Sequence, residues 1–148
     1  MKPLYKLTFE QAKRDGEIDV FRESLRENIR CRDFIDNEVA EKFDGMHLPD
    51  ECAENVVNEF GYDRTMWVIA NTILERTGDG RFHNKNVDWA KSLSIPQSSR
   101  NYEFALRSHS CIVDGLAGQI QSMYENLEQI QSQQEQETAP EETFNLNM

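Results

Sequence analysis

One segment, Gly61–Phe82, restricts the fold of this chain more than any other. It reads GYDRTMWVIANTILERTGDGRF and contains a nearly continuous apolar run, Met66–Ala70. Asp63 can begin a helix, and the Gly-Asp-Gly turn that follows Thr77 can end it. A helix that is apolar around most of its circumference must be buried on several sides. We therefore expect this helix at the centre of a folded domain.

Turn residues and helical spacing predict further helices on both sides of this segment. Thr8 can cap a short helix that Gly16 closes, and Glu17–Phe43 predicts one long helix without internal proline or glycine. Other helices are expected from Pro49 to Gly61, over 86–93, from about 102, and from about 110 onward. Short apolar runs at 104–106 and 111–113 leave a strand pair open as an alternative. The predicted fold is all-α, a compact bundle of about five to six helices.

The length of 148 residues fits one domain with an extension. Residues 1–118 are expected to form a single helical domain, and residues 119–134 to continue the last helix. Gln and Glu dominate after residue 130, and such a composition buries too little apolar surface to order itself. Residues 135–148 are therefore expected to form a disordered acidic tail.

The last expected helix carries an apolar stripe with spacings of three and four residues. Its members are Val113, Leu116, Ile120, Met123, Leu127 and Ile130. This spacing is typical of the a and d positions of a coiled coil, and the flanking positions are uncharged. The stripe either packs on its own domain or pairs with a second copy. In the second case, self-association would use Leu116, Ile120, Met123, Leu127 and Ile130, and the protein would be a homodimer.

The net charge is −11 and is unevenly distributed. Residues 1–60 carry 9 basic and 15 acidic groups, residues 61–100 carry 6 and 4, and residues 101–148 carry 1 and 8. Repulsion from a polyanion argues against direct binding of the nucleic-acid backbone. The charge instead favours a basic protein partner, such as a nucleic-acid-handling enzyme. The alternative is that the acidity only provides solubility.

The compartment is expected to be the cytoplasm. No apolar run is long enough to cross a bilayer, and the N-terminal residues are charged without an apolar signal-peptide core. The three cysteines, Cys31, Cys52 and Cys111, are odd in number and widely spaced, which favours reduced buried thiols over a disulfide framework.

No residue pattern completes a known catalytic or nucleotide-binding motif, and neither enzymatic activity nor a cofactor is expected. Asn71 lies inside the apolar helix and must bond either a ligand or a neighbouring backbone group. Arg81 could bind a carboxylate or phosphate, or form a salt bridge to a nearby acid. His109 and Asp114 suggest an acid–base pair, but their spacing does not place them on one helix face. A zinc site formed by His47, Cys52, His109 and Cys111 lacks the close spacing of known sites, so no metal is expected.

Six segments taken in order resemble a domain of unknown function that is common on conjugative and other mobile elements of gut bacteria. They are PLYKLTFEQAKRDGEIDVFRESLRENIRC, FDGMHL, DRTMWVIANTI, DGRF, Trp89-Ala90-Lys91 and SHSCIVDGL. The resemblance covers about residues 4–118. The family often has proline after the histidine of the last segment, where this chain has Ser110. No catalytic residue is assigned in the family, so none is transferred to this chain.

The resemblance implies a context in which small acidic proteins blunt host defences. The first hypothesis is a non-enzymatic inhibitor of a host defence nuclease, of the anti-CRISPR or antirestriction kind, with a basic nucleic-acid-handling protein as partner. Carboxylates of the long first helix would imitate phosphates, although the arginines between them weaken this idea. The expected partner-binding residues are Glu23, Glu27, Asp33, Asp36, Arg81 and Phe82. The alternative is a structural or regulatory module of the mobile element that assembles through the heptad stripe. An enzyme acting through His109 and Asp114 is the weakest hypothesis.

Overall fold

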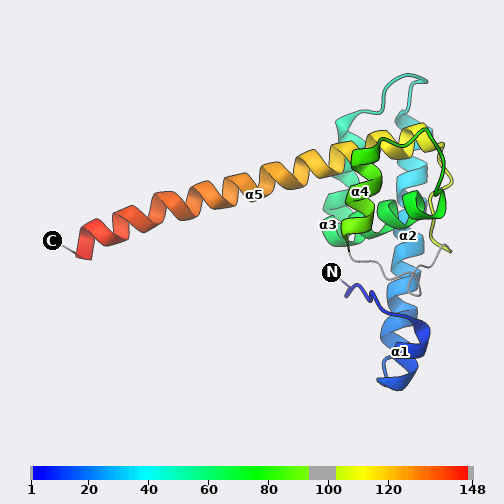
Figure 1. The fold of residues 1–148 in the computed structure, drawn as a ribbon, viewed down its shortest axis with the longest axis horizontal. Coiled ribbons are helices and arrows are strands. Elements are labelled where there is room, and N and C mark those ends of the chain that lie inside the picture. The colour runs from blue at the N-terminus through cyan, green and yellow to red at the C-terminus, as the bar shows by residue number, and fades with distance from the viewer. Residues whose placement is uncertain (1, 94–102, 147–148) are drawn as a thin grey trace.

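The computed structural model describes residues 2–93 and 103–146, and it describes the side chains of the last helix through residue 133. Its described residues form five α-helices and no strand (Figure 1). They are α1 (Phe9–Arg14), α2 (Ile18–Lys42), α3 (Asp50–Glu75), α4 (Asn84–Ser92) and α5 (Ser110–Leu146). The all-α prediction is confirmed, and the alternative of a strand pair is wrong, because 104–106 has no regular structure and 111–113 lies within α5.

The predicted cap residues begin and end the first helices. The Thr8 side chain accepts a hydrogen bond from the Gln11 N–H at 3.0 Å and caps α1, and Gly16 follows the helix with a φ of 71°. The long predicted helix is α2. Its buried residues Cys31, Ile35 and Val39 face the core. Of the apolar residues whose helical spacing predicted this helix, Ile35 and Val39 are buried, whereas Ile18, Phe21, Leu25 and Ile29 are only partly buried.

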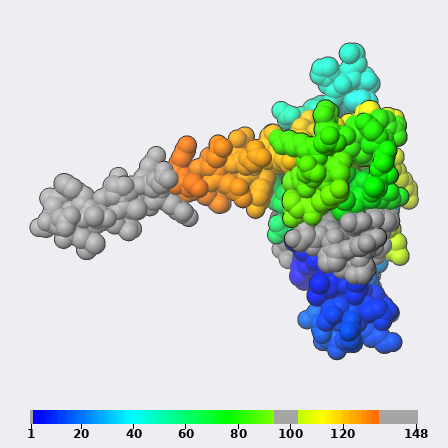
Figure 2. All heavy atoms as spheres, viewed as in Figure 1, coloured from blue at the N-terminus to red at the C-terminus, as the bar shows by residue number. Residues whose placement is uncertain are grey.

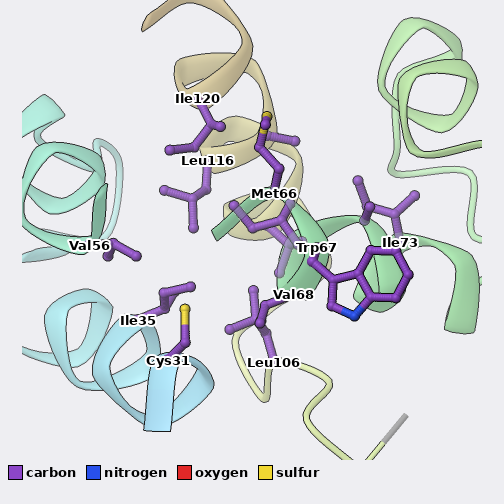
Figure 3. Close-up of a cluster of buried hydrophobic side chains, with 14 of the residues drawn as sticks. Cys31, Ile35, Val56, Met66, Trp67, Val68, Ile73, Leu106, Leu116 and Ile120 are labelled. Carbon is purple, nitrogen blue, oxygen red and sulfur yellow. The ribbon is translucent and has the colours of Figure 1, made fainter. Parts of the chain in front are cut away.

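The second half of α3 is the centre of the molecule. All residues from Arg64 through Leu74 are buried, and the helix packs against α2, α4 and α5 (Figure 1). Figure 3 shows Met66, Trp67, Val68 and Ile73 of α3 among side chains of the surrounding elements. The prediction that this helix is covered on several sides is confirmed.

Gly61 joins two segments that the sequence predicts as separate helices. Its φ of 83° and ψ of 163° break the helical geometry inside α3, so the two segments meet at a kink. That region of backbone conformation is essentially restricted to glycine. The hydroxyl of Thr65 donates to the Gly61 carbonyl at 2.7 Å. The hydrogen bond satisfies a carbonyl at the kink and begins the buried half of the helix.

The helix predicted from about Tyr102 is not found over 103–109, and Tyr102 lies outside the described residues. This segment crosses the protein as a loop because polar side chains bind its backbone. Arg76 Nη1 donates to the Ser108 carbonyl at 2.9 Å, and its Nη2 donates to the Leu106 carbonyl at 2.6 Å. The Thr72 hydroxyl accepts the N–H of Leu106 at 2.9 Å. The loop expected around Pro96 lies outside the described residues.

Two buried polar residues of α3 have structural partners. Asn71 is fully buried, and its Nδ2 donates to the Trp67 carbonyl at 2.8 Å, which is the backbone-capping alternative. Arg64 is 3% exposed, and its guanidinium donates to the carbonyls of Lys2 and Pro3, both at 3.0 Å, and to Asn28 Oδ1 at 2.9 Å. Arg64 therefore holds the N-terminal segment against α2 and α3.

The last helix, α5, extends away from the other helices (Figure 1). Its last aromatic contact with them is between Tyr124 and Tyr62, with ring centroids 5.4 Å apart. We call residues 125–146 the arm, and its described side chains extend away from the body (Figure 2). Of the side chains described from 125 through 133, only Leu127 is partly covered. The helical backbone continues through Leu146, so it includes most of the range predicted as a tail. The division into 1–118, 119–134 and a disordered 135–148 stays a prediction.

We predict opposite effects on stability from the same substitution at two glycines. Gly61→Ala should lower the free energy of unfolding by about 1–3 kcal/mol, because alanine is strained at this φ and ψ. Gly115→Ala should raise it by about 0.5–1 kcal/mol, because Gly115 is helical and an added Cβ meets no atom within 4 Å. Urea unfolding followed by far-UV circular dichroism measures both values. An unchanged stability of Gly61→Ala would show that the kink does not depend on glycine.

Candidate functional site

The first two predicted partner-binding carboxylates of α2 already contact cations of the same chain. Glu23 Oε1 lies 2.6 Å from Lys2 Nζ, and Glu23 Oε2 lies 3.5 Å from Arg26 Nη1. Glu27 is 7% exposed and pairs with Arg30. Burial alone would raise the pKa of Glu27, but its contacts with Arg30 and Lys2 outweigh burial and lower the pKa. These contacts leave little free negative charge on this part of α2.

The other two α2 carboxylates differ in their environment. Asp33 is exposed and contacts Arg32 Nε at 2.6 Å. Asp36 binds the loop before α5, since it accepts the N–H groups of Arg107 at 3.0 Å and Ser108 at 3.2 Å and the Ser108 hydroxyl at 2.7 Å. Asp36 thus has a structural partner in the same chain. A partner-binding role of the four α2 carboxylates stays a prediction.

The turn after α3 forms a closed polar network. Asp79 accepts hydrogen bonds from Arg81 Nε at 2.9 Å, from Arg81 Nη2 at 2.8 Å and from the Ser110 hydroxyl at 2.7 Å. These donors hold the pKa of Asp79 far below its usual range. The salt-bridge alternative for Arg81 is therefore confirmed. Phe82 is only 7% exposed and belongs to the core, so its ring is not part of the exposed surface of this turn.

The suggested pairing of His109 with Asp114 is wrong. His109 Nε2 lies 2.8 Å from Arg81 Nη1, and its Nδ1 accepts the N–H of Cys111 at 3.2 Å. Asp114 instead contacts His83, whose Nδ1 lies 2.5 Å from Asp114 Oδ2. The first turn of α5 directs Asp114 toward the start of α4, whereas His109 precedes the helix and lies beside the Asp79 turn.

The pair of His83 and Asp114 is part of a buried network that joins α4 to α5. Asp114 is 6% exposed and also accepts the N–H of His83 at 3.0 Å and the Asn86 side chain at 2.7 Å. Gln121 extends the network by donating to Asn86 Oδ1 at 2.6 Å. Burial alone would raise the pKa of Asp114, but the hydrogen bonds from Asn86 and His83 outweigh burial and lower it. The imidazole of His83 is 80% exposed, so a buried carboxylate orients an accessible ring.

No local pattern in the sequence predicts this network. His83 and Asp114 are 31 residues apart, and Asn86 and Gln121 are 35 apart. The short helix that contains Asn86 was predicted, and so was the helix that contains Asp114. Their relative rotation decides which polar side chains meet, and spacing within either helix does not specify that rotation.

A cavity of about 590 Å³ lies beside this network at the base of the arm. Asp50 and Glu54 of α3 line it, together with His83 and Lys85 at the start of α4. The facing part of α5 contributes residues from Gly118 to Asn126. The volume falls within the range of small-ligand and side-chain binding pockets in proteins, about 300–1,000 Å³.

The heptad stripe of α5 is divided between the core and the arm. Leu116 and Ile120 are 1% and 0% exposed and belong to the core (Figure 3). Met123 and Leu127 are partly buried, and Ile130 is 52% exposed. The first half of the stripe therefore packs on its own domain. Self-association through the second half stays a prediction.

The cysteines and histidines do not converge on a metal. Within the described residues, no group of three or more His, Cys, Asp or Glu side chains is placed to hold an ion. All three cysteines are free, and Cys31 and Cys52 are buried as expected. Burial raises the pKa of the Cys31 thiol to about 12. Cys111 is exposed, so the expectation of a buried thiol is wrong there, because this position faces away from the core at the start of α5.

Comparison with known proteins places the chain in a family. The family model described as "Protein of unknown function (DUF3849)" matches residues 4–125, and the chain therefore belongs to this family. The match includes the five-helix body and ends where the arm begins. No curated protein and no solved structure matches the chain. None of the helices over the described residues is long and apolar enough to span a membrane.

We predict that Asp114 stabilises the protein at neutral pH and that this contribution disappears in acid. Asp114→Asn should lower the free energy of unfolding by about 2 kcal/mol at pH 7, because hydrogen bonds to a buried carboxylate are charge-assisted. A carboxylate with a lowered pKa stabilises the fold above its ordinary pKa and loses that effect as pH falls through the folded-state pKa. The difference from wild type should therefore shrink toward about pH 3.

Urea unfolding at several pH values measures this difference, and Asp88→Asn is the matched control. Asp88 is an exposed carboxylate on α4, so its substitution should change stability by less than about 0.5 kcal/mol. A pH-independent effect of Asp114→Asn would contradict the assigned role of the carboxylate charge.

Proposed function

We propose that this member of the family is a non-enzymatic protein that uses its arm to bind a basic, nucleic-acid-handling protein. The target class is a host defence nuclease, of the anti-CRISPR or antirestriction kind, and the gene would belong to a mobile element. One observation carries the proposal: α5 extends away from the body as a helix whose charges have a single sign. Binding would block the surface with which the nuclease contacts its nucleic acid.

The charge of α5 supports a basic partner better than the charge of α2 does. After Cys111 the chain contains seven acidic residues and no lysine, arginine or histidine. Within the described part of the arm, Glu125 and Glu128 are exposed and form no ion pair. On α2, by contrast, basic residues contact Glu23, Glu27 and Asp33. A purely anionic arm attracts cations without internal competition, so the proposed binding surface is the arm and not α2.

The apolar residues of the arm supply the second part of the proposed surface. Leu127 and Ile130 lie three residues apart, so they share one face of the helix. Ile130 is 52% exposed. A helix with an apolar stripe and acidic flanks fits a groove with an apolar floor and basic edges, which is a common mode of peptide recognition. The acidic residues would increase the association rate, and the apolar stripe would prolong the complex.

We predict salt-sensitive inhibition of at least one nuclease. The purified protein is mixed with a panel of CRISPR and restriction nucleases, and DNA cleavage is scored across salt concentrations. Glu125→Lys combined with Glu128→Lys should weaken inhibition by about tenfold at low salt, because two attractions become repulsions. The loss should be smaller at high salt, since counterions screen exposed charges beyond about 8 Å at physiological ionic strength.

The matched control reverses two exposed carboxylates on α2 that have no described partner, Asp19→Lys combined with Glu41→Lys. This variant should inhibit as wild type does if the arm is the working surface. Equal losses from the arm and α2 reversals would indicate a response to net charge alone. Absence of inhibition at stoichiometric excess over the whole panel would contradict the nuclease target.

The exposed half of the stripe also supports a second candidate function, a structural or regulatory module that assembles through α5. In this case the apolar face of α5 packs against the same face of a second copy. The positions beside the stripe, Asn126 and Gln131, are uncharged and permit close approach of two helices. The two candidates differ in whether the free protein is already assembled.

For the assembly module, we predict that Leu127→Lys combined with Ile130→Lys converts a dimer to a monomer, because two charges would be buried in the interface. Multi-angle light scattering measures the mass, and far-UV circular dichroism checks the fold. Gln129→Lys combined with Ser132→Lys is the control, because it adds two charges at exposed positions outside the stripe and its flanks and should leave the mass unchanged. A monomeric wild-type protein at about 100 μM would exclude the assembly module as a stable dimer.

A further inference from the structure

We propose that the cavity at the base of the arm receives a lysine or arginine side chain of the basic partner. The inference rests on the proposed function, because it assigns a specific contact to the partner that the arm attracts. The cavity, about 590 Å³, lies between the start of α3, the start of α4 and the residues of α5 from Gly118 to Asn126. A chain bound along the arm would therefore reach it.

Two carboxylates on one wall provide the charge that such a side chain requires. Asp50 and Glu54 lie four residues apart on α3, so they share one face of the helix. Among the described residues, neither forms an ion pair or a side-chain hydrogen bond. Their neighbour Glu51, in contrast, lies 3.3 Å from Lys42. The negative charge that the chain itself does not neutralise is thus directed into the cavity.

The other walls offer acceptors and an apolar surface. His83 also lines the cavity, and its Nδ1 is held by Asp114. Gln119 lines the cavity, and its buried Oε1 accepts no hydrogen bond within the described residues. Met123 adds a flexible apolar side chain against which an aliphatic stem can lie. A guanidinium has five N–H donors and no acceptor, which matches this acceptor-rich lining.

Substitution of Lys85 can test whether the ligand of the cavity is a cation or an anion. Its side chain is the one permanent cation among the residues that line the cavity, and it is exposed at the start of α4. Lys85 repels a cationic ligand in the cavity, so removal of this lysine should strengthen binding. An anionic ligand would use Lys85 and His83, so the same removal should weaken binding. Each of the substitutions at Glu54 and Lys85 therefore shifts the affinity in one direction for a cationic ligand and in the opposite direction for an anionic ligand.

The test is a titration of the full-length ¹⁵N-labelled protein with N-acetyl-arginine methylamide, observed by two-dimensional NMR. This probe carries a guanidinium but no free carboxylate or amine, and N-acetyl-citrulline methylamide is its uncharged counterpart. Saturable shifts are expected at the amides of Gly118 and Ser122 with the arginine probe alone. Glu54→Gln should raise Kd by about three- to fivefold, Lys85→Gln should lower it, and Glu51→Gln should leave it unchanged.

Three results would overturn the proposal: no saturable shift near the cavity, equal binding of the citrulline probe, or a Kd that Glu54→Gln does not change. Tighter binding of acetate than of the arginine probe, lost in Lys85→Gln, would show an anion site and would overturn it as well. Glu125→Gln combined with Glu128→Gln tests the arm separately and should leave probe binding unchanged. Probe binding without inhibition of any nuclease counts against the proposed function and not against the cavity.

Discussion

The burial of the second half of α3 is the constraint on which the rest of the structure depends. Eleven consecutive residues, from Arg64 to Leu74, are withdrawn from water, and a helix can be covered in this way only if other elements surround it. The helices α2, α4 and α5 provide that cover, each with an apolar stripe of its own. Burial of apolar side chains contributes about 1.5–3 kcal/mol each, which makes this cluster the main source of stability.

Polar side chains then fix the segments that the apolar core leaves free. Arg64 binds the carbonyls of the N-terminal segment, Arg76 binds those of the loop before α5, and Asp36 binds the N–H groups of the same loop. Asp114 fixes the start of α4 against α5 in the same manner. Buried backbone groups must have partners, and in segments without helical hydrogen bonds side chains provide them. Several carboxylates and arginines of the chain are therefore structural, although their chemistry suggests binding.

This use of charge changes which surface is available to a partner. Internal pairing neutralises much of the acidic content of α2, whereas α5 carries carboxylates and no cation after Cys111. The arm leaves the body just after Tyr124, and the cavity lined by Asp50 and Glu54 lies at its base. Glu125 and Glu128 of the arm, and Asp50 and Glu54 at its base, form no ion pair among the described residues. These carboxylates are the basis on which an extended basic partner is proposed.

Most of the helices could be predicted from the sequence, because caps, glycines and apolar spacing act over three or four residues, but the helix expected from about Tyr102 is not found over 103–109. Thr8 and Gly16 have the predicted roles, and the apolar run of α3 was correctly placed at the centre. Which polar groups meet depends on the packing of distant segments, because His83 and Asp114 are 31 residues apart and Asp36 lies 71 residues from Arg107. Such contacts depend on the rotation of one helix against another and on the path of a loop. Local spacing specifies neither the rotation nor the path of the loop. The predictions for Phe82, which is buried, and for Cys111, which is exposed, were therefore wrong.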